Sequence, residues 1–481
     1  MADREKECRG VGGEGATASI ATFTRSASLV EISEVVRDRA ALSVADTIGV
    51  MLAGTTGDVA GPLRRYVAGH VGHGDARILG WDLQVPGELA AFANGTLGHA
   101  LDFDDAVLIV PMQASSIVVA ALLAAEPTGT LTGAALLEAY IVGIEVAAKI
   151  AQAIGLAHHA RGWHAAGTIG IFGAIAGLST LLQLDEQRVR YAVGIGSSMA
   201  SGLQCNFGTM TKPLHSGSAA RNALTAVELA RDGWTSDRTS LESNSGFFEI
   251  YGTGRSSALA IAPSLGNPYV FEDPGVALKR YPCCYALHRA VDGIRSLLEG
   301  PRGVEEIVEI RCSVPPGGLR LLYPRPKTGL EGKFSMQYAL AATALDGTLD
   351  LESFEVPQVL RPSVAELYER IIVREEERCS VGDGTVRTLS PGTVGFVEVS
   401  VRFADGTSRT ATTYKPKGSP GRPLEWLDVR EKFLGCAAVA GVQEPDAREV
   451  IDALERLETI DDLNPLLRRL SIARCAPVMT G

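Results

Sequence analysis

LQCNFGTMTKPLHSGSAARNA, at residues 203–223, is the stretch on which the predicted fold and function of this 481-residue chain both depend. It gathers Lys212, His215 and Arg221 with several hydroxyl groups and two glycines. Glycine lets the backbone approach a ligand closely, and the helix predicted to follow offers free N–H groups and a positive dipole end to an anion. The pattern favours a loop that binds the carboxylates of a small substrate, although a polar loop with a solvated lysine fits the same residues.

The composition indicates a globular protein with more than one domain. A length of 481 residues exceeds the usual size of one hydrophobic core. The net charge of −11 argues against nucleic acid or an anionic membrane as a partner, so any anion site must be a local cluster of cations. No apolar run is long enough for a membrane helix. The eight cysteines contain no C-x-x-C pair, which indicates reduced thiols in a cytoplasmic protein.

Periodicity along the chain predicts a mainly α fold with an α+β second domain. Residues 1–24 lack the apolar segment of a secretory signal and are expected to be a disordered leader. Residues 25–266 have helical spacing and many small residues, which predicts a large all-helical bundle. Residues 267–423 contain alternating stretches, with Asp405-Gly406 as a hairpin turn, and predict a smaller α+β lid domain. Residues 424–476 are helical again, so the bundle is built from both chain ends.

Four glycines within one predicted helix could suggest a dinucleotide site. Gly167, Gly170, Gly173 and Gly177 do not have the G-x-G-x-x-G spacing, and no strand precedes them. Close packing between helices is the favoured interpretation.

Residues 99–105, HALDFDD, place a histidine and three carboxylates at a predicted helix end. These residue types could bind a metal. Asp102 could instead act as an acid or base buried beside a pocket, or the acids could simply be solvated. No matching ligand cluster occurs elsewhere in the sequence, so no metal is expected.

Two further residues could move a proton. His164 follows a tryptophan and precedes a predicted helix, so burial and the helix dipole should lower its pKa. A neutral imidazole could act as a base or a donor, whereas a packed core histidine fits equally well. Tyr338 begins a helix of the second domain and could donate a proton across a cleft, or could merely pack.

KRYPCCYALH, at residues 279–288, lies just after the predicted domain boundary. Lys279 and Arg280 are well placed there to close over an anionic ligand. A rival hypothesis pairs Cys284 with His288, one helical turn away, as a nucleophilic dyad. No third orienting group or oxyanion motif accompanies that pair.

Taken together, these stretches resemble the MmgE/PrpD family, which includes 2-methylcitrate dehydratase, cis-aconitate decarboxylase and iminodisuccinate epimerase. The resemblance spans about residues 28–475 and rests on GHALDFDD, GWH…TIGIFGA, NFGTMTKPLHSGSAARN, KRYPCCYALH and KFSMQYALAATALDG. It implies a homodimer with an active site between the helical domain and the lid, and no organic cofactor. It also implies the catalytic residues Asp102, His164, Lys212, Lys279 and Tyr338.

Two departures from the family pattern concern this site. Gln113-Ala114-Ser115 stands where family members usually carry a histidine, a small or proline residue and a serine. Glutamine can hydrogen-bond a carboxylate but cannot exchange a proton near neutral pH. Cys284 stands where decarboxylases nearest the mammalian type have histidine. The substrate-binding residues expected are Gln113, Ser115, His215, Arg221, Arg280 and Cys284.

The sequence therefore predicts a cofactor-independent lyase, a decarboxylase or dehydratase of a small di- or tricarboxylate of the cis-aconitate or methylcitrate type. Lys212 and Lys279 would stabilise an enolate-like intermediate, His164 or Tyr338 would move the proton, and Asp102 would orient a partner. An epimerase or isomerase of an amino- or imino-dicarboxylate such as iminodisuccinate is the alternative. A family member that binds an anion without catalysis is a third possibility, because a usual histidine is missing.

Overall fold

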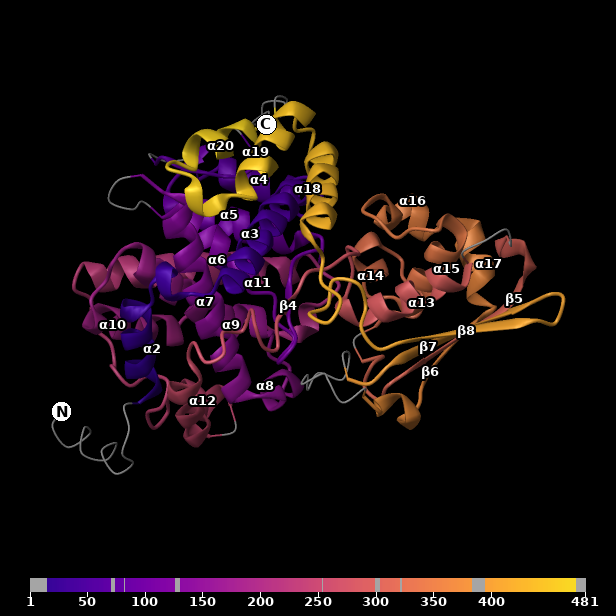
Figure 1. Cartoon of the computed structure of the whole chain (residues 1–481), viewed down its shortest axis with the longest axis horizontal. Helices are drawn as coiled ribbons and strands as arrows, with labels where there is room; N and C mark the ends of the chain where they lie inside the picture. The colour runs from indigo at the N-terminus through magenta and orange to yellow at the C-terminus, as the bar shows by residue number, and fades with distance from the viewer. Residues whose placement is uncertain are drawn as a thin grey trace.

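The computed structural model describes residues 15–70, 74–81, 83–125, 130–252, 254–298, 303–320, 322–382 and 394–472. Figure 1 shows a larger helical body beside a smaller body that contains helices and a sheet. The C-terminal helices α18 to α20 return to the larger body (Figure 1). The predicted fold class, mainly helical with a small mixed sheet in the C-terminal region, is confirmed.

The helical body has one hydrophobic core that draws on both ends of the chain. Its helices are α2 (Ala16–Ser26), α3 (Glu34–Gly54), α4 (Ala60–Ala68), α5 (Gly87–Ala100), α6 (Ser115–Ala124), α7 (Gly133–Ile154), α8 (Leu156–Ala160), α9 (Ala165–Leu181), α10 (Glu186–Ser197), α11 (Thr211–Arg231), α12 (Phe247–Tyr251), α18 (Trp426–Ala440), α19 (Glu444–Leu454) and α20 (Asn464–Arg469). Helix α18 packs along α3, so the end of the chain closes on its beginning.

The predicted disordered leader is wrong for its second half. Helix α2 occupies part of that segment, and its Ile20 and Ala21 are buried in the core. The hydroxyl of Thr17 donates to Glu242 at 2.6 Å and ties the helix to a distant turn. Small residues let this short helix pack against α9 and α10, although they give a weak hydrophobic signal in the sequence. Residues 1–14 lie outside the described residues.

The smaller body is built on a four-stranded sheet with its own hydrophobic core. Its elements are α13 (His288–Leu298), β5 (Ile307–Val314), α14 (Gly329–Gly332), α15 (Met336–Asp346), α16 (Val356–Val359), α17 (Pro362–Tyr368), β6 (Ile371–Glu375), β7 (Val397–Phe403) and β8 (Ser408–Thr413). The strand order is β6-β5-β7-β8, with β5 and β6 parallel and the other pairs antiparallel. Gly406 has a φ of 85° in the hairpin between β7 and β8, which confirms the predicted turn.

Small residues bring α7 and α9 into close contact. Gly167, Gly170, Gly173 and Gly177 all lie in α9, and a Cβ at Gly173 would lie 2.6 Å from the carbonyl oxygen of Gly143 in α7. No side chain fits at that distance, so the helix-packing interpretation of these glycines is confirmed.

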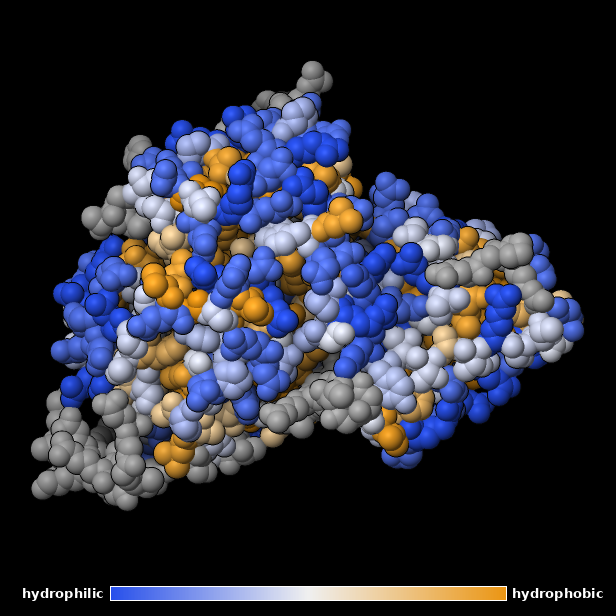
Figure 2. All heavy atoms as spheres, in the orientation of Figure 1, coloured by the Kyte–Doolittle hydropathy of each residue, from blue (hydrophilic) through white to orange (hydrophobic). Residues whose placement is uncertain are grey.

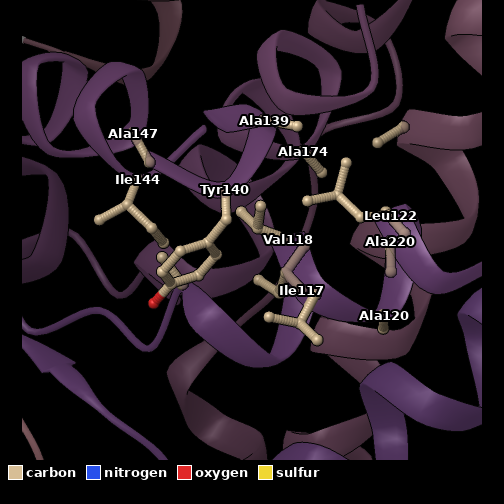
Figure 3. Packing of buried hydrophobic residues seen from close by; sticks show 14 of the residues in the cluster. Ile117, Val118, Ala120, Leu122, Ala139, Tyr140, Ile144, Ala147, Ala174 and Ala220 are labelled. Carbon is tan, nitrogen blue, oxygen red and sulfur yellow. The ribbon is translucent and has the colours of Figure 1, made fainter. Parts of the chain in front are cut away.

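Aliphatic side chains fill the core around this crossing. Figure 3 shows Ile117 and Val118 of α6 close to Tyr140 and Ile144 of α7. The hydroxyl of Tyr140 lies at the edge of this group, where it can meet a polar partner (Figure 3). A tyrosine this deep in a core needs such a partner, because an unpaired buried hydroxyl is costly.

A second glycine contact joins α5 to α11. A Cβ at Gly217 would lie 2.3 Å from the carbonyl oxygen of Phe92 and 2.1 Å from Oγ1 of Thr96. The backbone of α11 therefore lies directly against the backbone and the Thr96 side chain of α5, with no room for a side chain at position 217. This contact places the C-terminal end of α5 beside the N-terminal turn of α11.

The outer surface differs from this core in composition. Figure 2 shows hydrophilic residues over most of one face, with hydrophobic residues in smaller separate areas. Within the described ranges, no helix combines the length and the apolar character that a membrane crossing requires.

A buried carboxyl group anchors the turn after α5 to α6. Asp105 accepts hydrogen bonds from the backbone N–H and the hydroxyl of Ser115, at 3.2 and 2.8 Å. The same hydroxyl lies 2.6 Å from the phenol oxygen of Tyr140. Burial and the nearby Asp104 raise the pKa of Asp105 to about 7. Ser115, expected from the sequence to bind substrate, serves this anchor instead.

Asp105→Asn is expected to flatten the pH dependence of stability. The folded-state pKa lies above the ordinary value of 3.8, so the folded protein binds the extra proton between about pH 4 and pH 7 and loses stability as the pH rises through that window. The slope attributable to this group is at most about 1.4 kcal/mol per pH unit. Thermal-unfolding midpoints from pH 5 to 8 measure it. Asp461→Asn, at an exposed position, is the control, and equal slopes for wild type and Asp105→Asn would contradict the prediction.

Candidate active site

A pocket of about 160 Å³ lies at the seam between the two bodies. The residues that line it and carry polar or aromatic side chains are Asp102, Gln113, His159, His164, Phe207, Lys212, Lys279, Cys284, Tyr285, Arg320 and Phe334. They come from segments on both sides of the seam, which is where small-molecule sites commonly form.

Asp102 holds two ammonium groups beside this pocket. Its Oδ1 lies 2.7 Å from Nζ of Lys212 and 3.0 Å from Nζ of Lys279. Burial alone would raise the pKa of this carboxyl, but the two lysines hold it well below its ordinary value. Because two cations share one carboxylate, this group of three side chains keeps one net positive charge.

Local structure explains why these three residues meet. Asp102 has a φ of 53° in the turn after α5, and Lys212 lies in the first turn of α11. Lys279 follows β4 (Val276–Ala277), which pairs with β3 (Ala106–Val107) just after the aspartate turn. Burial lowers the pKa of Lys279, but Asp102 and Asp104 raise it overall, so this amine stays protonated.

Lys432 of α18 supports the same residues from behind. Its ammonium group donates to the carbonyl oxygens of Phe103 and Lys279, each at 2.8 Å, and lies 2.8 Å from Oδ1 of Asp46. It does not line the pocket, so its role is to position the turn and Lys279. Sequence reasoning missed it, because a lone lysine in an amphipathic helix usually lies in solvent.

His99 connects the lysine cluster to a further carboxylate. Its Nδ1 lies 2.8 Å from Asp104, and its Nε2 lies 2.8 Å from Nζ of Lys212. Since the ammonium group can only donate, the imidazole must be neutral, with its proton on Nδ1. Burial lowers the pKa of His99. Asp104 raises this pKa, and Lys212 offsets part of that rise. The sequence showed this histidine in the HALDFDD motif but gave no reason to assign it this role.

A metal is not needed to explain this cluster. His99, Asp102 and Asp104 place possible ligand atoms within 4.8 Å of one another. The ammonium group of Lys212 already receives the lone pairs of His99 Nε2 and Asp102 Oδ1. An ammonium group supplied by the chain thus already binds two of the three possible ligands, His99 and Asp102.

His164 presents a neutral imidazole to the pocket. It precedes α9, its ring stacks on His99 with centroids 5.6 Å apart, and its Nδ1 lies 2.9 Å from Nδ1 of His215. Its Nε2 is buried and makes no hydrogen bond to any described residue. Burial and the charge of Lys212 hold its pKa well below the ordinary value, in the direction expected from the sequence.

Tyr338 does not reach the pocket. It is fully buried in the core of the smaller body, and its hydroxyl donates to the carbonyl oxygen of Ser353. The predicted role of Tyr338 in proton transfer is therefore not supported by its position. The direction of the Tyr338 side chain is set by packing. Tyr338 lies near the start of α15, and its ring contacts Phe354.

Two predicted substrate-binding arginines also lie elsewhere. Arg221 lies over the ring of Phe92 at 5.2 Å. It is far from Lys212, because nine residues along α11 correspond to about 13 Å of rise. Arg280 is exposed and lines a neighbouring cavity of about 460 Å³, on the other side of the chain from Lys279. Of the remaining predictions, Gln113 and Cys284 line the pocket, and His215 contacts it through His164.

The nucleophilic dyad is not supported. Burial raises the pKa of the Cys284 thiol and lowers the pKa of His288 to about 3. Both groups are therefore neutral near pH 7, whereas a reactive cysteine needs its thiolate. Cys284 forms part of the wall of the pocket.

Five of the polar or aromatic lining residues escaped the sequence analysis, namely His159, Phe207, Tyr285, Arg320 and Phe334. The rings of Phe207 and Phe334 lie 5.5 and 5.4 Å from Nζ of Lys212, one from each side of the seam. Arg320 follows β5 and reaches across the seam to the carbonyl oxygen of Ala160, at 3.5 Å. The two phenylalanines occur in motifs quoted above, but an arginine in a Gly-rich loop carried no signal of its own.

Comparisons with known proteins agree with this architecture. The MmgE/PrpD N-terminal domain matches residues 18–260, and the MmgE/PrpD C-terminal domain matches residues 281–457. The mouse cis-aconitate decarboxylase is 28% identical, with 94% of this chain and 93% of the relative covered. The human cis-aconitate decarboxylase is 27% identical over the same shares, and the Aspergillus terreus enzyme is 27% identical over 84% and 86%. Since the two family domains together match most of its length, the chain belongs to the MmgE/PrpD family.

Proposed function

We propose that this protein is a cofactor-independent lyase that decarboxylates or dehydrates a small di- or tricarboxylate of the cis-aconitate or methylcitrate type. The observation that carries the proposal is the pair of buried ammonium groups on Asp102, beside the neutral imidazole of His164. Relatives named cis-aconitate decarboxylases, aligned over nearly the whole chain, support the substrate class.

Electrostatics favour a substrate with several carboxylates. Lys212, Lys279 and Asp102 together leave one positive charge, and Arg320 adds another at the lid side of the pocket. The pocket walls are otherwise largely apolar, so these charges act in a medium of low dielectric constant. Gln113 also lines the pocket and can donate a hydrogen bond to a further carboxylate.

The proposed chemistry uses these charges in the transition state. When the bond to the departing CO2 breaks, its electron pair passes into the conjugated system and negative charge grows on a remaining carboxylate. Lys212 and Lys279 stabilise that charge, and fixed cations of this kind commonly supply the largest catalytic contribution. The Nε2 of His164 then delivers a proton to carbon. Asp102 binds both amines and holds them in place.

An epimerase or isomerase of an amino- or imino-dicarboxylate is the second candidate. Gln113 favours it, because this side chain lines the pocket at the place where family members usually have a histidine. In that reaction His164 removes a proton from one face of the carbon, and inversion requires that a proton return to the opposite face. The same two lysines would stabilise the carbanion.

The proposal includes a homodimer, which the family resemblance implies. Static light scattering of the purified chain measures this, and a monomer mass would remove the dimer from the proposal without affecting the chemistry.

Proton NMR in D2O with a panel of di- and tricarboxylates tests the reaction. Loss of CO2 with one deuterium incorporated is expected for a decarboxylase, loss of water without net deuterium uptake is expected for a dehydratase, and deuterium exchange without net product identifies the epimerase. Binding without either change would support a catalytically silent anion-binding protein and would overturn the proposal.

Lys212→Met is expected to lower kcat/KM by about 10²- to 10³-fold, because a fixed donor to the developing charge is lost. Lys149→Met is the matched control, since Lys149 has the same 5% exposure but binds Glu145 and the carbonyl oxygen of Pro268, away from the pocket. Both variants should be less stable, yet only Lys212→Met should lose activity per folded molecule. Equal rates in the two variants would remove Lys212 from the mechanism.

Gln113→His is expected to raise CO2 release from cis-aconitate, by up to about 10²-fold, because the imidazole adds a proton donor to the pocket wall. The variant Gln113→Asn keeps an amide and should not gain activity. If both variants release CO2 at the wild-type rate, the missing histidine does not limit decarboxylation.

A further inference from the structure

His164 and His215 face each other through equivalent ring atoms. Their Nδ1 atoms are 2.9 Å apart, and such a contact requires one ring to donate an N–H and the other to accept it. Burial lowers the pKa of His164 far below its ordinary value and that of His215 to about 4. Both rings are therefore neutral near pH 7, and each carries one proton on either Nδ1 or Nε2.

The backbone holds the two rings in this arrangement. Gly202 has a φ of 140°, and its carbonyl oxygen accepts the N–H of His164 at 3.0 Å. A Cβ at Gly202 would lie 3.3 Å from Nδ1 of His215 and 3.4 Å from Cβ of His164. A Cβ at Gly167 would lie 3.2 Å from Cβ of His215. Two glycines thus let the start of α9 and the first turns of α11 press the rings together.

The pair connects the pocket to a more accessible position. His164 lines the pocket with an Nε2 that no described residue hydrogen-bonds, and it is 1% exposed. His215 does not line the pocket and is 8% exposed. A proton that enters at His215 can therefore reach the pocket without crossing the lysine cluster.

We infer that His164 and His215 form a neutral proton relay, in which His215 supplies and removes the proton that His164 exchanges with the substrate carbon. This inference rests on the proposed function for the identity of the reaction. It changes the role of His215 from the substrate-binding residue expected from the sequence to a residue that acts through His164.

Each step of the relay balances. Water protonates Nε2 of His215 as its Nδ1 proton passes to Nδ1 of His164, while the Nε2 proton of His164 passes to the carbanion. Both imidazoles end neutral in the opposite tautomer, and hydroxide is left in solvent. In the reverse direction Nε2 of His164 takes a proton from carbon, and the same two transfers deliver one to water.

The neighbouring charges explain why a neutral relay suits this site. Lys212 and His99 face His164, and both disfavour positive charge on its ring. An imidazolium beside Lys212 would place two cations in a buried pocket, which is costly. Transfer between tautomers moves the proton without creating that intermediate.

His215→Asn tests the relay by kinetics. Asparagine can hydrogen-bond Nδ1 of His164 but cannot pass a proton on, so the rate of substrate deuteration in D2O should fall by about 10²-fold with little change in KM. His215→Ala should regain activity when free imidazole is added. The control His158→Asn replaces another buried histidine, which is bonded to Thr168 and Tyr251 and does not line the pocket, and should keep the wild-type rate per folded molecule.

Nitrogen-15 NMR of the protein labelled at histidine tests the relay without substrate. Both rings should stay neutral from pH 5 to 8, with shifts between those of the two tautomers, and His215→Asn should move the signals of His164. A ring protonated at pH 7, or a single fixed tautomer in both rings, would overturn the relay. If no acid is turned over by wild type, the proposed function fails and this measurement alone decides the relay. If wild type is active and His215→Asn is equally fast, the relay fails and the function stands.

Discussion

One carboxylate shared by two ammonium groups is the constraint on which the rest of this structure depends. Lys212 and Lys279 could not lie this close in a buried pocket without Asp102 between them, because their repulsion would not be screened by water. The fold meets this requirement with a tight turn after α5, the glycine contact between α5 and α11, and the β3–β4 pair. Each of these features brings one member of the cluster to the seam.

The fold class and the main site residues could be predicted from the sequence because their signals are local. Helical spacing, hairpin chemistry and small-residue content describe neighbours along the chain, and they gave the helical body and the mixed sheet. Motifs that contain Asp102, His164, Lys212 and Lys279 supplied residues that the structure brings together. The helix-packing interpretation of the glycines in α9 depended on spacing alone, and packing distances agree with it.

For most of the residues that sequence reasoning misplaced, the error lies in the direction of the side chain rather than in the position of the residue. Tyr338 and Ser115 belong to the expected motifs, yet their hydroxyl groups turn to a carbonyl in the lid core and to the Asp105 anchor. Arg280 follows a site lysine but points to the other side of the chain. The short helix α2 gave too weak a hydrophobic pattern to be recognised, and Lys432 lacked any motif. Such outcomes follow from long-range packing, which no local pattern encodes.

The contacts of Lys432 carry a consequence for how the protein matures. This side chain lies near the end of the chain, yet it binds the carbonyl oxygens of Phe103 and Lys279, which belong to the turn and strand that form the site. During synthesis the earlier segments leave the ribosome first, so their polar backbone groups must wait for α18 to arrive. Competence is therefore acquired only after α18 has left the ribosome, and a nascent chain that stalls before α18 would hold the right residues without their final support.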